Sequence, residues 1–203
     1  MSRVSWAQKI QAIAQTGLAY AGDPYDRERY EQLQALAHEM LAEASASRPE
    51  DIRELFALEK GYPTPKVDVR AVVFRDGELL LVQEKSTGGW TLPGGWADIG
   101  DSASEVAARE TREEAGLDVR TEKLLAVFDK ARHTHPPTVF YCYKLFFRCA
   151  LIGGEARVNH ETSDVGFFPR EGLPPLDTER VTAEQIARMF VHLDQPERPT
   201  DFD

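Results

Sequence analysis

Three glutamates that lie close together in the sequence are the clearest candidates for chemistry. Glu110, Glu113 and Glu114 are spaced at i, i+3 and i+4, so in a helix they would share one face, where like charges repel. A divalent cation would offset that repulsion, and Mg²⁺ and Mn²⁺ prefer carboxylate oxygen. The pattern predicts a metal site; the alternative is an acidic, solvated helix face paired with Arg109 and Arg112.

The residues around the glutamates predict the helix itself. Ser102 followed by Glu105 is typical of a capping box, and Gly116 is the residue type that ends helices in the left-handed conformation, so we expect a helix over 103–115. The Pro-Gly-Gly loop at 93–95 lets backbone approach a phosphate or a metal closely. This loop favours the metal interpretation over the solvated face.

These residues resemble the Nudix box, in which a glycine, an acidic residue, an Arg-Glu pair, a Glu-Glu pair and a last glycine stand at fixed spacing. Two positions depart from it: Asp101 stands where the family has Glu, and Thr111 where the family has an apolar residue. Neither change removes a main ligand, and the resemblance covers about residues 66 to 195. The matching residues are Gly95, Asp101, Arg109, Glu110, Glu113, Glu114, Gly116 and Leu117.

The resemblance implies a pyrophosphate hydrolase that uses two or more Mg²⁺ or Mn²⁺ ions. Glu110 and Glu114 would hold the principal ion, and Glu113 would contribute directly or through water. The carbonyl of Gly94 can add a ligand. Arg109 can reach one carboxylate and fix its orientation.

A general base is expected in a loop beyond the sheet, because family members often draw one from there. Glu161 is our choice in that loop, which also carries His160 and Asp164. Two alternatives remain open: Glu161 is only an exposed turn residue, and the base is Glu110 or Glu113 instead.

Four residues are candidates for binding the substrate. His133 and His135 lie in a proline-stiffened loop that can line the pocket for the nucleoside or its leaving group, and Lys85 or Lys144 can lie near phosphate. In the alternative interpretation, the Pro-Pro pair at 136–137 only turns the chain into the next strand. The two histidines are not a zinc site without further ligands in reach.

The chain is expected to divide into a helical N-terminal extension at 1–62, a Nudix domain at 66–195 and a flexible tail at 196–203. Strand-like runs alternate with two helices in the Nudix domain, which predicts an α/β fold, an α/β/α sandwich around a mixed sheet. The resemblance implies the same fold. The expected strands cover 67–74, 78–83, 119–128 and 139–149, and Thr182 starts the last helix.

The extension resembles that of a Nudix subgroup that hydrolyses nucleoside diphosphates linked to another group, including CDP-choline. Its apolar stripes, one of them Trp6-Ile10-Ile13, exceed what a layer of about 60 residues can bury alone. Because the family's catalytic domains commonly pair, we expect a homodimer with these helices at or beside the interface.

The net charge of the chain indicates which classes of binding partner to expect. With 24 Lys and Arg against 34 Asp and Glu, the net charge is −10, so duplex nucleic acid and anionic membranes are not expected to bind. No apolar run approaches about 20 residues and no secretory signal opens the chain, so the cytoplasm is the expected compartment.

The leading functional interpretation is a metal-dependent pyrophosphohydrolase. It would cleave a nucleoside diphosphate linked to a second moiety, such as CDP-choline or ADP-ribose, to a nucleoside monophosphate and a phosphorylated group. One alternative is a hydrolase of RNA ends or damaged nucleotides, which the acidic surface disfavours. Another is a non-catalytic, nucleotide-sensing regulator on the same fold, against which the intact box carboxylates argue.

Overall fold

The computed structural model describes residues 2–203, which form two compact units. Among these residues, the first unit comprises 2–65 and Pro137–Tyr141, and the second comprises Lys66–Pro136 and Cys142–Asp203. Among the described residues, no helix has the length and apolar character that crossing a membrane requires.

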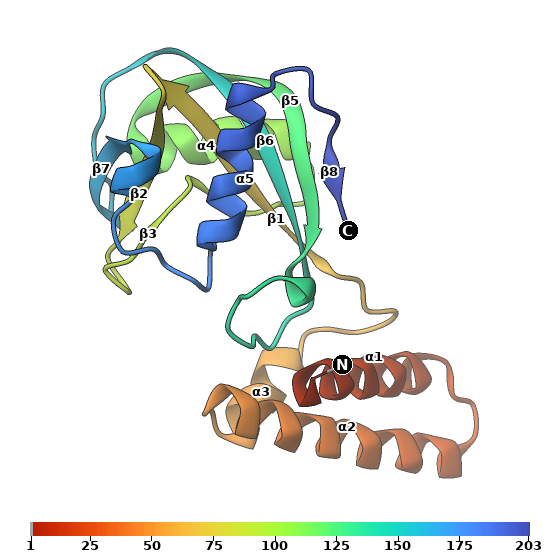
Figure 1. The fold of residues 1–203 in the computed structure, drawn as a ribbon. Coiled ribbons are helices and arrows are strands. Elements are labelled where there is room, and N and C mark those ends of the chain that lie inside the picture. The colour runs from red at the N-terminus through yellow and green to blue at the C-terminus, as the bar shows by residue number, and fades with distance from the viewer. Residues whose placement is uncertain (1) are drawn as a thin grey trace. The chain divides into compact units, whose positions relative to one another are not determined.

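Three helices make up most of the first unit (Figure 1). Side chains at the helix starts satisfy amides that the first turn leaves free: Ser2 accepts a hydrogen bond from the Ser5 amide, and Asp23 accepts one from the Tyr25 amide. The helices are α1 (Arg3–Tyr20), α2 (Pro24–Ser45) and α3 (Pro49–Phe56).

Helix α1 buries two alanines and two glutamines and exposes large apolar side chains. Ala7 is fully buried, whereas Trp6 and Ile13, from the predicted apolar stripe, are 53% and 61% exposed. The two long helices approach so closely that a β-carbon at Gly17 would collide with the ring of Tyr30. Small residues make that approach possible, and α1 therefore presents its larger apolar side chains outward.

A short segment from far along the sequence completes the helical unit. The carbonyl of Thr138 accepts a hydrogen bond from a glutamine of α1 at 3.0 Å, and the Phe140 ring meets Phe56 edge-on at 5.5 Å. The strand predicted over 139–149 therefore starts only at Cys142. The stretch predicted as one continuous Nudix domain is interrupted here, because these residues pack with the helices.

The second unit is built on a mixed sheet of eight strands in the order β3-β2-β1-β6-β5-β8, with β4 paired to β1 and β7 to β2. β1 runs parallel to β6 and β5 runs parallel to β8, while the other pairs are antiparallel. The strands are β1 (Lys66–Arg75), β2 (Glu78–Glu84), β3 (Trp90–Thr91), β4 (Gly94–Trp96), β5 (Leu117–Asp129), β6 (Cys142–Gly154), β7 (Thr162–Phe168) and β8 (Asp201–Phe202).

Helices cover both faces of this sheet (Figure 1). Side chains alternate along β1, so Val69 packs with Val106 of one helix and Val72 with Ile186 of the other. The two helices are α4 (Ala103–Ala115) and α5 (Ala183–Asp194). This arrangement confirms the predicted α/β/α sandwich around a mixed sheet.

Helix α4 has the predicted bounds because both of its ends are fixed locally. Ser102 and Glu105 form the capping box at its start. Gly116 ends it with φ 72°, and a β-carbon there would collide with the carbonyl of Glu155. The helix that carries the three glutamates is therefore set by its own sequence.

The last residues differ from the flexible tail predicted at 196–203. β8 pairs with β5, and the carboxylate of Asp201 accepts hydrogen bonds from Arg188 at 3.2 Å, His192 at 2.9 Å and Arg198 at 3.1 Å. Burial alone would raise the pKa of Asp201, but these three hydrogen bonds lower it. Two of the partners belong to α5, which only the fold brings to this segment.

We expect Asp201→Asn to lower the free energy of unfolding at pH 7 by about 1 to 3 kcal/mol, because a charged acceptor of three hydrogen bonds is lost. Since the folded-state pKa is lowered, this contribution is present above the unfolded pKa of about 3.9 and disappears as the pH falls through the folded value. Denaturant melts between neutral and acidic pH measure it. Asp194→Asn, which removes the exposed partner of Arg170, is the control and should cost less than about 1 kcal/mol. A deficit that stays constant with pH would contradict the assignment.

Candidate active site

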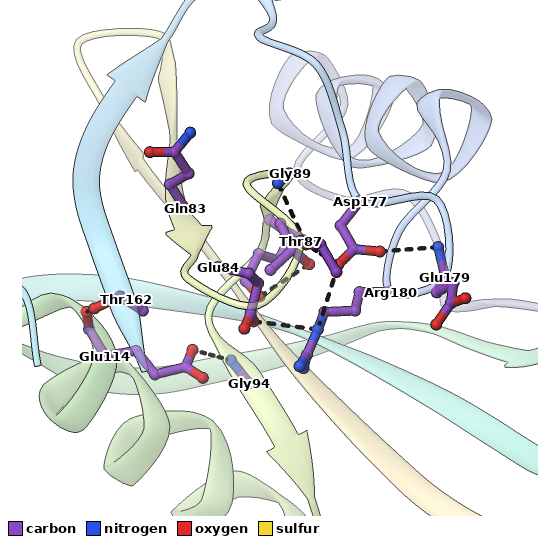
Figure 2. A network of polar contacts seen from close by, with 12 residues as sticks. Gln83, Glu84, Thr87, Gly89, Gly94, Glu114, Thr162, Asp177, Glu179 and Arg180 are labelled. Atoms are coloured by element: carbon purple, nitrogen blue, oxygen red, sulfur yellow. Dashed lines mark hydrogen bonds and ion pairs between the residues drawn. The ribbon is translucent and has the colours of Figure 1, made fainter. Parts of the chain in front are cut away.

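The three glutamates of α4 lie on one side of the helix but differ in burial. The side chain of Glu113 is 54% exposed and that of Glu110 is 13% exposed, while Glu114 as a residue is only 3% exposed. The amide of Gly94 in β4 donates a hydrogen bond of 2.9 Å to Glu114 (Figure 2). The face therefore runs from a carboxylate enclosed by the sheet to one in solvent.

Burial controls the charge at the enclosed end. It raises the pKa of Glu114 to about 7, and the nearby carboxylates of Glu110 and Glu84 act in the same direction. Arg70 and the Gly94 amide oppose that rise in the pKa of Glu114. Burial also raises the pKa of Glu110, against the pull of Arg109. The nearby cations therefore favour the ionised form of both carboxylates against the effect of burial.

Strand β4 brings bare backbone against the glutamates. Gly94 has φ 146°, and a β-carbon there would collide with the carbonyl of Val69. A β-carbon at Gly95 would lie 3.2 Å from Oε1 of Glu110. Glycine at both positions permits this close approach of the backbone to its neighbours. The close approach to a phosphate or a metal that the Pro-Gly-Gly loop predicts stays a prediction.

Arg109 gathers the more exposed carboxylates. Its guanidinium lies 2.9 Å from Glu110 and 3.2 Å from Glu113, and it also reaches Asp101 at 3.3 Å and Asp98 at 3.4 Å. Burial alone would lower the pKa of Arg109, but Glu110 and Glu113 raise it. The predicted contact between Arg109 and a box glutamate is present, and it is shared among four carboxylates.

A buried charged group under the site was not predicted. Arg70 of β1 donates two hydrogen bonds to Asp68, at 2.7 and 3.2 Å, and one to the carbonyl of Leu92 at 3.1 Å. Lys144 of β6 is ion-paired with the same aspartate, and its burial lowers its pKa to about 7. The sequence carried one signal, since two charges alternate with apolar residues along β1. Lys144 is enclosed and its ammonium group pairs with Asp68. The predicted position of Lys144 near phosphate stays a prediction.

A second unpredicted group lies beyond Gly94 (Figure 2). Glu84, at the end of β2, is buried, and its carboxylate lies 3.2 Å from Nε of Arg180. The same nitrogen lies 3.6 Å from Asp177. Burial raises the pKa of Glu84, and Arg180 and Arg70 oppose the rise. A carboxylate that ends an apolar strand run is a sequence signal, whereas nothing local marked Arg180.

The loop before β7 is tied to the end of β2. Nζ of Lys85 donates hydrogen bonds to the carbonyls of Asn159 at 2.7 Å and His160 at 3.3 Å. The carbonyl of Glu161 accepts the Lys85 amide at 2.9 Å, and its exposed carboxylate lies 3.0 Å from Nε2 of His160. Lys85 thus fixes the loop that carries Glu161, and its predicted contact with phosphate stays a prediction.

The two predicted substrate histidines contact different segments. Nε2 of His133 lies 3.2 Å from Asp203, and its ring packs on Phe128 with centroids 4.4 Å apart. Nδ1 of His135 donates to the carbonyl of Thr178 at 2.7 Å, and burial lowers its pKa. Only His135 therefore touches the segment that carries Arg180.

The carboxylates are not gathered around a common point. Within residues 2–203, no group of three or more His, Cys, Asp or Glu side chains is close enough to hold a metal ion in this arrangement. Each glutamate has its own partner instead: Glu114 takes the Gly94 amide, while Arg109 spans Glu110 and Glu113.

Sequence comparison identifies the class of protein. The NUDIX domain family matches residues 64–190, and a family described as the UDP-X-like, N-terminal oligomerisation domain matches residues 2–56. The chain therefore belongs to the Nudix family and is a Nudix hydrolase, as the box predicted. This sets aside the alternative of a non-catalytic regulator.

Individual relatives and solved structures are similar to the chain over two thirds or more of its length. A Bacillus subtilis protein named "Putative ADP-ribose pyrophosphatase YjhB" is 47% identical over 197 residues, covering 97% of this chain and 95% of the relative. The crystal structure of a UDP-X diphosphatase matches with 37% identity and a TM-score of 0.65 over 100% of both chains. That of an ADP-ribose pyrophosphatase from Streptococcus suis matches with 41% identity and a TM-score of 0.64, over 69% of this chain and 100% of the other.

We expect Glu114→Gln to stabilise the protein in EDTA at alkaline pH. The folded-state pKa of about 7 lies above the unfolded value, so ionising Glu114 costs folding free energy that is absent at low pH and grows as the pH rises towards 7. The amide avoids that cost and can still accept from Gly94. The gain should be on the order of 2 to 4 kcal/mol at pH 8 and near zero at pH 4. Denaturant melts measure it, with the more exposed Glu113→Gln as control. Equal stability of parent and variant at both pH values would contradict the assignment.

Proposed function

We propose that this Nudix hydrolase cleaves the pyrophosphate bond of a nucleoside diphosphate linked to a second group, releasing a nucleoside monophosphate and a phosphorylated group. The observation that carries this is the Glu110 and Glu114 face of α4 set against the bare backbone of Gly94 and Gly95. ADP-ribose is the first candidate and a UDP conjugate the second, following the names of the relatives. CDP-choline is the third, following the resemblance of the extension.

The residues present suit Mg²⁺ or Mn²⁺ by their chemistry, since the donors around α4 are carboxylate and carbonyl oxygens. We propose that Glu110 and Glu114 hold the principal ion, with Glu113 and the Gly94 carbonyl as further ligands and two or more ions in total. Such ions, when bound, neutralise charge on the phosphoryl oxygens and activate the attacking water. Arg109 orients the carboxylates that it spans. For Glu110 to bind the ion, the ion pair between Arg109 and Glu110 must weaken.

Glu161 is the proposed general base. It would take a proton from the water whose oxygen bonds to phosphorus as the bridging P–O bond breaks. Its carboxylate is exposed. Nζ of Lys85 donates to the carbonyls of Asn159 and His160, just before Glu161, and the Lys85 amide donates to the carbonyl of Glu161 itself. These contacts support a fixed position for a group that the sequence placed only in a loop.

A cavity of about 970 Å³ beside α4 offers room for one of the two moieties that flank the pyrophosphate. Glu113 forms part of its lining, so the cavity adjoins the proposed metal face. Its charged and apolar sides suit a phosphorylated group with a carbon skeleton. The lining includes Arg109, Arg112, Arg157, Ile152 and Val158.

Product analysis tests the function. ADP-ribose, UDP-glucose and CDP-choline are each incubated with the chain and Mg²⁺ or Mn²⁺, and we expect at least one to give the nucleoside monophosphate. EDTA should abolish the reaction, and Glu114→Gln should lower turnover by roughly two orders of magnitude or more. Glu122→Gln, which removes a carboxylate paired with Arg120 on β5, is the control and should retain parental turnover. Unchanged turnover in Glu114→Gln would refute the metal assignment.

We propose that the chain forms a homodimer through its helical unit. The matching family is described as an oligomerisation domain, and α1 exposes Trp6, Ile13 and Tyr20 at intervals of seven residues. This spacing places all three on one face of the helix. This face is apolar, while the buried side of α1 carries alanines and glutamines, as expected of a helix that packs on two sides.

Ile13→Glu should convert the dimer into a monomer, because it places a charge in the middle of that face. Light scattering after size-exclusion chromatography measures the mass. Leu58→Glu, at a position 92% exposed in the same unit, is the control and should keep the parental mass. A monomeric parent, or a dimer that survives Ile13→Glu, would show that this face is not the interface.

A further inference from the structure

Arg180 is fixed near the end of β2 by a short network with Glu84 and Asp177 (Figure 2). The segment that precedes it pairs with β3, since the Trp90 amide donates to Pro175 and the Asp177 amide donates to Trp90, both at 2.9 Å. Thr87 donates to the Asp177 carboxylate at 2.9 Å. The loop that presents Arg180 is therefore held by backbone hydrogen bonds and by the side chain of Asp177.

The guanidinium of Arg180 contacts two carboxylates of this network through Nε. Its Nε lies 3.2 Å from Glu84 and 3.6 Å from Asp177. Among residues 2–203, its two Nη groups donate no hydrogen bond, and the side chain is 36% exposed. A guanidinium held at Nε keeps a planar pair of donors free, and that pair matches two oxygens of a phosphate.

The network borders the proposed metal face. Figure 2 shows Glu84 and Arg180 on one side of Gly94, with Glu114 on the other side of it. Electrostatics show the same proximity, because Arg70 lowers the pKa of both Glu84 and Glu114 and Glu84 raises the pKa of Glu114. A pyrophosphate lying over Gly94 would thus have carboxylates on one side and the Nη edge of Arg180 on the other.

We propose that Arg180 binds the pyrophosphate of the substrate through its Nη groups, while Glu84 and Asp177 hold the guanidinium in position through Nε. This inference rests on the proposed function. It assigns a binding role to Arg180 and positioning roles to the two carboxylates, none of which the box contains. The interaction is made with the bound substrate as well as with the transition state, so its loss raises KM more than it lowers kcat.

Steady-state kinetics on the conjugate that the parent cleaves test the role. Arg180→Met should raise KM by about 10- to 100-fold, as expected for charge-assisted hydrogen bonds, with kcat within a few-fold of the parent. Arg180→Lys should recover only part of the loss, because a single point charge replaces the planar fork. Arg170→Met is the matched control: Arg170 is 46% exposed and pairs with Asp194 at 2.6 Å on the same unit, and its KM should be parental.

A binding measurement separates this inference from the proposed function. Isothermal titration with methylenediphosphonate and Mg²⁺ needs no turnover, because the P–C–P bridge is not hydrolysed. The affinity should fall by about 10- to 100-fold in Arg180→Met and stay parental in Arg170→Met. A chain that cleaves no conjugate yet shows this loss would refute the proposed function and uphold the role of Arg180. Parental affinity and KM in a folded Arg180→Met would overturn the inference.

A second variant controls for a folding defect in Arg180→Met. Arg180→Met leaves Glu84 buried without its cation, so the double variant Arg180→Met with Glu84→Gln removes both charges together. Thermal melting verifies its fold. We expect the double variant to bind methylenediphosphonate as weakly as the single one, because the guanidinium is missing from both. A folded double variant with parental affinity would overturn the inference.

Discussion

A carboxylate enclosed between α4 and β4 is the constraint on which the rest of the second unit depends. Glu114 is buried and held by one backbone amide, that of Gly94. An unpaired buried charge costs several kcal/mol, so the surrounding structure must supply compensation. Arg70 supplies it from below, and Arg70 is in turn held by Asp68, which also pairs with Lys144. The buried charges thus alternate in sign from Glu114 through Arg70 and Asp68 to Lys144 of β6, and each is compensated by its neighbour.

Arg70 and Arg109 differ in burial and therefore in how they compensate the carboxylates. Arg70 is buried and fixed by three hydrogen bonds, so it acts as a permanent counter-charge for the inner carboxylates. Arg109 is more exposed and spans four carboxylates, none of which it holds alone. A guanidinium shared in this way orders the outer side chains and can exchange one partner for another at modest cost. Fixed inner charges and adjustable outer ones suit a site where anionic substrate and divalent ions come and go.

The helical unit follows a different packing rule. Its two long helices approach through small residues, as the contact of Gly17 with Tyr30 requires, and the larger apolar side chains of α1 remain outside. The unit also takes in residues 137–141 from the middle of the chain. That segment starts just after the loop of His133 and His135 and ends at β6, the strand that carries Lys144. Residues 137–141, which lie between the two histidines and the buried lysine in the sequence, are therefore held by the helices.

The sequence by itself determined α4, its two caps, the face with three glutamates and the glycine loop before it. Each of these depends on residues within about two helical turns of one another, so local spacing carries the information. The alternation of apolar residues likewise predicted the strands and the sandwich. Family resemblance added the chemistry expected of the glutamates.

Only the tertiary structure decided which other charges join them. Asp68 and Lys144 are 76 residues apart in sequence, and Glu84 meets Arg180 across the whole of α4, β5 and β6. Neither pairing leaves a local pattern, because parallel pairing of β1 with β6 and docking of a loop on β3 create it. For the same reason the C-terminal residues, which read as a polar tail, become a strand: Asp201 finds its cations on α5. The sequence states which residues are charged, whereas the tertiary fold determines which of them pair.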